Sequence, residues 1–259
     1  MIAALEEELG FLLLIRDRNG VRLTPEGETL LPNVRELLYA GERCQQLAFK
    51  IKGLNIGHVV IGTAYSAFYP ILAEIISDFH RVYPDIQVQL ISGYSSELLE
   101  KLDRHQADIC IISKREGKHS WLPILHDDMV AWLPGDHPLA GLSAFPISEF
   151  EKEPYIETYP DKDIDNTRVF ESCHIRPRLR FSSMDSMATY SMVEAGLGIS
   201  MNNAINGRRL SGSVCIMPLE PKQRIEIGVA SLAEGSPAAG TFLSYMCDHS
   251  IMKDLKNHI

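Results

Sequence analysis

The spacing of apolar residues downstream of Gly57 predicts alternating strands and helices. "HVVIGTA" is typical of a buried strand, and residues 68–82 place apolar side chains at helical spacing before Pro84 ends the helix. "IQVQLISG" alternates as a strand does, "SSELLEKLDRHQ" indicates a short helix, and "ADICIIS" indicates a third strand. Parallel strands need crossovers of about a dozen residues or more, so this order favours a doubly wound α/β sheet.

A second round of the same alternation follows. "DDMVAWLPGDHPLA" indicates a strand that runs into a Gly/Pro turn, where the chain can cross between two lobes. Strand and helix patterns then repeat as far as "LGISMN", and "VCIMPL" and "RIEIGVAS" add two strands. Ser236 and Pro237 open a last helix as a cap and a first-turn proline. We therefore expect lobe I over about 57–132 and 229–259, and lobe II over about 133–228.

A different pattern lies between Thr24 and Lys52. Thr24 followed by Pro25 predicts the start of a helix, in which apolar or small residues recur at spacings of four and three: Leu30, Val34, Leu37, Gly41, Cys44, Ala48 and Ile51. This heptad stripe fits a helix packed on its own domain or a helix paired with a copy of itself. Pro32 argues mildly against a straight helix. The residues expected to dimerise are Leu30, Val34, Leu37, Cys44 and Ile51.

The first 24 residues predict a helix and a hairpin. "AALEEELG" is helical and ends at Gly10, "RNG" is a tight turn, and "VRLT" returns as a strand. Helix, hairpin and long helix in this order are similar to the back half of a winged helix-turn-helix, with the hairpin as the wing. Arg16, Arg18 and Arg22 are then candidates for contacts with DNA phosphates, although an ordinary hairpin fits the same residues.

Charge and composition narrow the classes of function. Residues 1–57 hold seven Lys or Arg and eight Asp or Glu, a balance of −1 out of a total of −9, so neither part has the basic surface usual for nucleic-acid binding. The first ten residues carry acids where a signal peptide carries Lys or Arg, and no apolar run approaches about 18 residues. We expect a cytoplasmic protein without a membrane partner. The five scattered cysteines and nine histidines show no metal-ligand spacing, so no metal or cofactor is expected.

One segment carries a family resemblance. "ALEEELGFLLLIRDRNGVRLTPEGETLLP" resembles the end of the DNA-binding domain of LysR-type transcriptional regulators, and "GDHPLA" and "VEAGLGISM" also look like that family. The matching positions of the first segment are Leu5, Glu6, Leu9, Gly10, Leu13, Arg16, Gly20, Val21, Arg22, Leu23, Thr24, Gly27 and Leu30.

The resemblance implies a fold and a function for the whole chain. The fold is a partial winged helix-turn-helix over 1–24, a linker and dimerisation helix with a hinge over 25–56, and a two-lobed effector domain over 57–259, shaped like periplasmic solute-binding proteins. The function is DNA-binding regulation of transcription by a dimer or tetramer that senses a small metabolite. Met1 falls within the family's recognition helix. We therefore expect either a start upstream of Met1, which we favour, or a sensor fragment whose DNA binding is weakened or lost.

Ligands of open α/β sheets bind beyond the carboxyl ends of the strands, near helix N-termini. "TAYSA", "SGYSS" and "FSSMD" stand at such ends, so the candidates to face one cleft are Thr63, Ser66, Ser95 and Ser183. Helix capping is the alternative role of these hydroxyls.

The family resemblance adds candidates on both sides of the cleft. It places Ser66 and Ser95 where the family holds a small ligand, often a carboxylate. It places Met201 and Asn202 on the opposite wall, where the family commonly has an apolar residue and a proline. Tyr159 and Asp161 are further candidates. The expected effector is a carboxylate or an amino acid, and a carboxylate such as Asp161 near the cleft would favour a ligand with an amine.

Two other classes of function remain as alternatives. A solute-binding protein for uptake shares the two-lobed design, but the start of the chain does not resemble an export signal. An enzyme would need a reactive constellation. The sequence has no G-x-G-x-x-G after a strand, no P-loop and no G-x-S-x-G, so we expect no catalysis.

Overall fold

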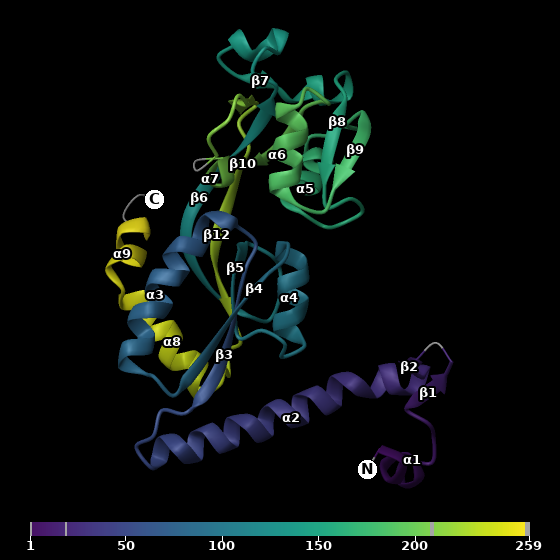
Figure 1. The fold of residues 1–259 in the computed structure, drawn as a ribbon, viewed down its shortest axis with the longest axis vertical. Helices are drawn as coiled ribbons and strands as arrows, with labels where there is room; N and C mark the ends of the chain where they lie inside the picture. Colours follow the sequence, from purple (N-terminus) through teal and green to yellow (C-terminus); the bar gives the residue numbers. More distant parts are fainter. Residues whose placement is uncertain (1, 19, 208–209, 257–259) are drawn as a thin grey trace.

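The chain forms a hairpin-bearing N-terminal segment, one long helix and two α/β lobes (Figure 1). The structure is a computed structural model and describes residues 2–18, 20–207 and 210–256. The long helix lies across one end of the molecule next to lobe I, and lobe II lies at the other end (Figure 1). The α/β class and the order of segments expected from the sequence are confirmed.

Side-chain hydrogen bonds tie the N-terminal elements together. These elements are α1 (Ile2–Leu9), β1 (Leu14–Asp17), β2 (Gly20–Leu23) and α2 (Pro25–Ile51). The Glu6 carboxylate accepts from the backbone N–H groups of Leu13 and Leu14 at 2.7 and 3.0 Å. The Thr24 hydroxyl accepts from the Gly27 N–H at 2.9 Å and so caps α2. Helix, hairpin and linker therefore form one connected unit.

The expected hairpin is present, with β1 and β2 paired antiparallel. Gly20 has a φ of 123°, which a residue with a side chain rarely adopts. Asn19 lies outside the described residues. Helix α2 continues through Pro32 as a single element.

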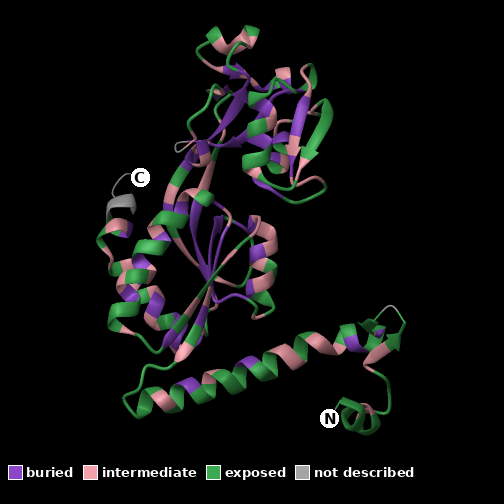
Figure 2. Ribbon diagram, viewed as in Figure 1, coloured by how far each residue is buried: buried purple, intermediate pink, exposed green. Residues whose placement is uncertain are grey.

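Lobe I is built around three parallel strands with helices on both faces. Its elements are β3 (Gly57–Thr63), η1 (Ser66–Phe68), α3 (Tyr69–Val82), β4 (Ile86–Ser92), α4 (Ser95–Asp103), β5 (Ile109–Ser113), α8 (Pro237–Asp248) and α9 (Ser250–Lys256). Strand β3 pairs parallel with both β4 and β5. Helix α3 buries Leu72, Ile75 and Phe79, which follow the predicted helical spacing. Figure 2 shows the sheet buried between the helices.

Lobe II contains shorter elements around its own core. They are η2 (Pro138–Gly141), β7 (Phe145–Pro146), η3 (Ile147–Glu151), β8 (Tyr155–Thr158), α5 (Asp165–Ser172), β9 (Leu179–Ser183), α6 (Ser186–Glu194), β10 (Ser200–Asn203), α7 (Ala204–Gly207) and β11 (Cys215–Glu220). Strands β8 and β9 pair parallel, whereas β10 and β11 pair antiparallel with the end of β6. Aromatic rings of Phe150, Tyr155 and Phe170 meet edge to face in the core.

Two crossings join the lobes. Strand β6 (Ser120–Leu133) pairs with β12 (Arg224–Ser231) in lobe I and continues into lobe II. The second crossing is the short connection from β11 to β12. Strand β12 also pairs antiparallel with β5, so the sheet is mixed rather than wholly parallel. The lobes can therefore change their relative angle only by bending at these two crossings.

Helix α2 docks on lobe I through two buried side chains, Tyr39 and Gln46. The Tyr39 hydroxyl accepts from the Ser236 N–H at 3.0 Å and donates to the Asp108 carboxylate at 3.4 Å. Gln46 accepts from the Ala238 N–H at 3.1 Å. These side chains satisfy N–H groups at the N-terminus of α8, which have no partner within their own helix. The linker is thereby fixed to the start of α8.

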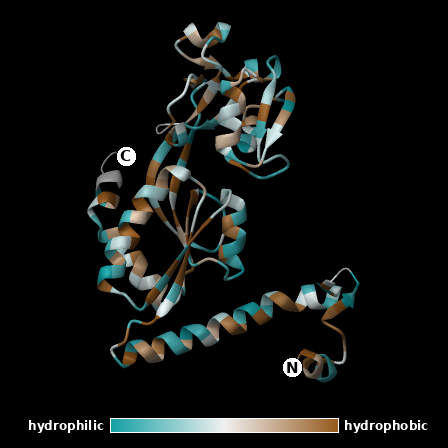
Figure 3. Cartoon of the chain, in the orientation of Figure 1, coloured by the Kyte–Doolittle hydropathy of each residue, from teal (hydrophilic) through white to brown (hydrophobic). Residues whose placement is uncertain are grey.

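The heptad stripe is not the face that docks on lobe I. Leu37 and Ile51 are 72% and 80% exposed, and Cys44 is also exposed. Leu30 and Val34 are half-buried. Figure 3 shows hydrophobic and hydrophilic positions alternating along α2. Packing on its own domain and presenting an apolar stripe are thus properties of two different faces of α2.

Replacing Tyr39 with Phe should destabilise the protein by about 1 to 3 kcal/mol, because the Ser236 N–H and the Asp108 carboxylate lose a buried partner. Urea unfolding measures the change. Tyr83→Phe is the matched control, since no hydrogen bond of its hydroxyl to the described residues is present and its ring is only half-buried. Equal stabilities of the two variants would contradict the docking role of Tyr39.

Candidate functional site

A cleft between the lobes holds two adjoining spaces at the carboxyl ends of the parallel strands. The outer cavity has a volume of about 360 Å³ and is lined by Thr63 and Ser66 from lobe I and by Tyr159 and Asp185 from lobe II. The inner space, about 40 Å³, is lined by residues that include Ser95. Strand ends and helix starts from both lobes therefore converge on one place, as the strand-end rule predicts.

An ion pair joins the two lobes beside the inner space. The Arg115 guanidinium, two residues beyond β5, donates to the Asp165 carboxylate at the start of α5 over 3.0 Å. The two side chains are only 5% and 8% exposed. Buried charges are costly unless each has a partner, so each of these groups depends on the other.

Hydroxyl groups surround the ion pair. Ser113 donates to Asp165 at 2.5 Å and accepts from Arg115 at 2.7 Å. The Ser95 hydroxyl lies 3.0 Å from that of Ser113 and accepts the Ser113 backbone N–H at 3.1 Å. Tyr65 donates to the second Asp165 oxygen at 2.9 Å. Burial, and then the Asp165 charge, raise the pKa of Tyr65 well above its usual value, so its hydroxyl remains a donor.

A second bridge between the lobes lies at the more exposed rim. The Ser96 hydroxyl donates to the Asp163 carboxylate at 2.7 Å. Arg168 binds the same carboxylate through two nitrogens at 2.6 and 2.7 Å. Hydrogen bonding from Arg168, followed by that from Ser96, lowers the pKa of Asp163 to about 2. This bridge stays charged over the physiological pH range.

The predicted ligand residues of lobe I all reach the cleft, in different roles. Thr63 is buried, and its hydroxyl accepts the Tyr65 N–H at 3.2 Å. Ser66 is exposed at the start of η1, and Ser95 bonds to Ser113 instead of capping its own helix. Their side chains therefore contribute to the walls of the cleft, and capping does not account for Ser95.

The predicted residues of lobe II are more dispersed. Tyr159 lines both spaces and Asn202 lines the inner one. Met201 is fully buried in the lobe II core, and only its carbonyl approaches the site, by accepting from Asn166 at 2.6 Å. Ser183 donates to the Asp185 carbonyl and does not line either space.

The carboxylates that line the cleft are Asp165 and Asp185, whereas Asp161 lines neither space. Asp161 lies in an outer depression with Glu157 and Arg168, and its backbone has a φ of 60°. Burial, and then the Asp161 charge, raise the pKa of Glu157. The sequence reasoning missed Asp165 because an acidic residue at the start of a helix reads as a capping residue.

Ser113 and Arg115 were missed although a usable signal was present. They follow "ADICII", the third strand of lobe I, and the strand-end rule was applied only to the first two strands of that lobe. Tyr65 lies within "TAYSA", and the strand-end rule predicts only the hydroxyls of Thr63 and Ser66 from that segment.

The DNA-contact candidates lie on the hairpin. Arg16, Arg18 and Arg22 are exposed, and Arg22 lies 3.8 Å from Asp17. Figure 1 shows the hairpin at the end of α2 away from the lobes.

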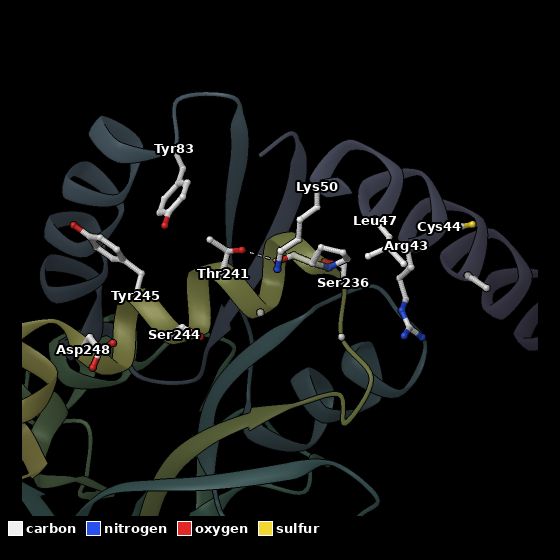
Figure 4. A pocket seen from close by; sticks show the side chains of 14 residues that line it. Arg43, Cys44, Leu47, Lys50, Tyr83, Ser236, Thr241, Ser244, Tyr245 and Asp248 are labelled. Carbon is white, nitrogen blue, oxygen red and sulfur yellow. Dashed lines mark hydrogen bonds between the residues drawn. The ribbon is translucent and has the colours of Figure 1, made fainter. Parts of the chain in front are cut away.

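A larger and more open hollow of about 960 Å³ lies between α2 and α8 (Figure 4). Arg43 and Lys50 extend from α2, and Tyr245 and Asp248 extend from α8. No strand ends converge here, and Thr241 is occupied by donating to the Pro237 carbonyl at 2.8 Å. The interlobe cleft, with its buried donors, is the better candidate for a ligand site.

Within the described part of the chain, no group of three or more His, Cys, Asp or Glu is placed to hold a metal ion. Across the same residues, every helix is too short or too polar to cross a membrane.

Comparison with known proteins gives consistent results. Residues 52–250 match the family description "LysR substrate binding domain". The chain is 30% identical to the HTH-type transcriptional regulator YvbU of Bacillus subtilis over 247 residues, which cover 93% of this chain and 85% of YvbU. It is 29% identical to the regulator AlsR of the same organism, over 77% of this chain and 68% of AlsR.

Solved structures support the fold. A full-length OxyR variant from Pseudomonas aeruginosa matches with a TM-score of 0.69 at 22% identity, over 95% of this chain and 82% of that one. The effector-binding domain of QuiR in complex with shikimate matches with a TM-score of 0.64 at 21% identity, over 79% of this chain and 99% of that one. The family match over most of the chain and the similarity to YvbU carry the assignment: this chain belongs to the LysR family of transcriptional regulators.

Proposed function

We propose that the effector of this transcriptional regulator binds in the interlobe cleft through a carboxylate held by Ser95, Ser113 and Arg115. The observation that carries the proposal is the buried Arg115 guanidinium, which points with the Ser113 hydroxyl toward one negatively charged oxygen. A guanidinium is always charged, and its planar donors suit a carboxylate. The nearby N-terminus of α4 also favours an anion.

The body of the effector would occupy the outer cavity. Its walls include Tyr69, Trp132 and Tyr159, whose rings suit the carbon skeleton of a small metabolite. Among the described residues of this wall, the one formal charge is the Asp185 carboxylate. Burial, and then the Asp185 charge, raise the pKa of Tyr159. An effector amine would find a partner in Asp185, which supports an amino acid as one form of the effector.

The proposed route to DNA runs through consecutive elements. An effector that binds two interlobe angles with different affinity shifts their populations. Bending at the connection into β12 would move α8, on which Tyr39 and Gln46 hold the linker. The linker carries the hairpin, where Arg16, Arg18 and Arg22 would contact phosphates.

Self-association through α2 completes the proposal. The exposed Leu37, Cys44 and Ile51 support pairing with a second copy, as a dimer or a dimer of dimers, with Leu30 and Val34 extending the seam. We place the protein in the cytoplasm, where its DNA target lies and where its five cysteines remain reduced. We propose no catalytic role, because the named relatives are regulators.

Replacing Ser66 with Trp should abolish the response to effector and leave folding intact, because Ser66 is exposed and its side chain borders the outer cavity. The test is a thermal-shift screen of the wild-type chain against small carboxylates and amino acids, repeated on the variant with each molecule that binds. Ser143→Trp is the control, since Ser143 is exposed in lobe II and does not line the cleft. Equal ligand titrations for Ser66→Trp and the wild type would contradict the placement of the effector.

Substituting Leu37 and Ile51 with Asp should shift the protein toward the monomer by at least about tenfold in dissociation constant, because two charges would enter an apolar seam. Sedimentation velocity over a concentration series measures the shift. Leu142→Asp introduces a charge at an exposed leucine of lobe II, outside α2, and should leave the association unchanged. An unaltered distribution in the α2 variant would show that the stripe is not the seam.

A further inference from the structure

Asp165 occupies the position that an effector carboxylate would take. One of its oxygens accepts from Ser113 and Arg115, and the other accepts from Tyr65. These three donors belong to lobe I, whereas Asp165 begins α5 in lobe II. Within lobe II, the Asn203 amide also donates to the second Asp165 oxygen, at 3.5 Å. A single side chain therefore fills the anion subsite of the opposite lobe.

Asp165 already occupies the donors that a second carboxylate in the subsite would need. The Ser113 and Tyr65 hydroxyls have one proton each to donate, and both donate it to Asp165. An incoming carboxylate and the Asp165 carboxylate would also repel each other at this depth. The two can only alternate in the subsite.

The segment between β8 and α5, which leads to Asp165, has a strained backbone. Tyr159 and Asp161 both have left-handed backbone conformations, with φ values of 55° and 60°. Such conformations cost free energy in residues with a Cβ and persist where other contacts hold them. The contacts of Asp163 and Asp165 with lobe I hold this segment in place.

We propose that Asp165 is an intramolecular substitute for the effector carboxylate, holding the lobes together in the absence of effector and leaving the subsite when a carboxylate binds. The proposal rests on the proposed function for the identity of the subsite. Beyond that function, the Asp165 side chain competes with the effector for the subsite. The apparent affinity for carboxylates therefore depends on how readily Asp165 is displaced.

The contact between Arg115 and Asp165 could also be a permanent ion pair with a purely structural role. Such a pair would have the same geometry, but its site would not bind a free carboxylate. If the subsite accepts any carboxylate, a free one should replace the missing side chain once Asp165 is removed. Formate is the smallest such probe and fits a space vacated by a truncated aspartate.

The experiment is thermal unfolding of the full chain carrying Asp165→Ala, titrated with sodium formate and, separately, with sodium chloride at the same ionic strength. The variant should melt below the wild type, because Arg115 loses its buried partner. Formate should restore stability with saturation, and chloride should not. The dissociation constant for formate should be at least about tenfold lower in the variant than in the wild type. If the variant is unfolded without formate, formate binding is measured instead by the recovery of the helical circular dichroism signal as formate is added.

Two further variants test whether the formate effect is specific to the Asp165 site. Asp163→Ala removes another lobe II carboxylate that contacts lobe I, and it should show no saturable formate effect. The double variant Arg115→Ala with Asp165→Ala has no unpaired buried cation, so it should fold without formate and ignore it.

A formate effect in Asp165→Ala no larger than that of chloride would overturn the exchange, and so would an equal effect in the double variant. The proposed function can fail separately. Saturable formate rescue, combined with a wild-type chain whose regulation of transcription ignores every carboxylate, would keep the exchange and reject a carboxylate as the effector.

Discussion

The contact between Arg115 and Asp165 constrains the whole arrangement of the lobes. Both groups are nearly out of water, and each lies on a different lobe, so the closed cleft is the state in which neither charge is left alone. The hydroxyls of Tyr65 and Ser113 and the amide of Asn203 also donate hydrogen bonds to the Asp165 carboxylate. The chain connects the lobes where β6 continues between them and where β11 leads into β12, and the Ser96–Asp163 bridge joins them at the rim, so the buried ion pair adds to these links in fixing the interlobe angle.

The connection between β12 and α8 is the route by which a change in the interlobe angle would move the linker helix α2. Strand β12 ends at Ser231 and α8 begins at Pro237, so the strand beside the crossing and the helix that holds the linker are neighbours in sequence. Tyr39 and Gln46 attach α2 to the first turn of α8 by hydrogen bonds to its free N–H groups. A polar attachment of this kind fixes the position of the linker and leaves the apolar stripe available for another copy of the chain.

Local sequence patterns predicted the elements well and their long-range partners poorly. Apolar spacing predicted β3, α3, β4, α4 and β5, and the strand-end rule pointed to Ser66 and Ser95. The antiparallel pairing of β12 with β5 and β6 joins segments about a hundred residues apart, for which local periodicity carries no signal. Asp165 was missed for a related reason: an acidic residue at a helix start is common for capping, and its partners lie about 50 and 100 residues away. Tyr39 and Gln46 lie off the heptad stripe, and nothing nearby in sequence distinguishes them from solvated helix residues.

The most direct test of the account is a crystal structure of the Asp165→Ala chain grown in formate. We expect closed lobes with formate bound in the subsite, its oxygens within hydrogen-bonding distance of the Ser113 hydroxyl and the Arg115 guanidinium. A structure in which Arg115 has turned out to solvent, or in which the closed subsite contains no formate, would contradict it.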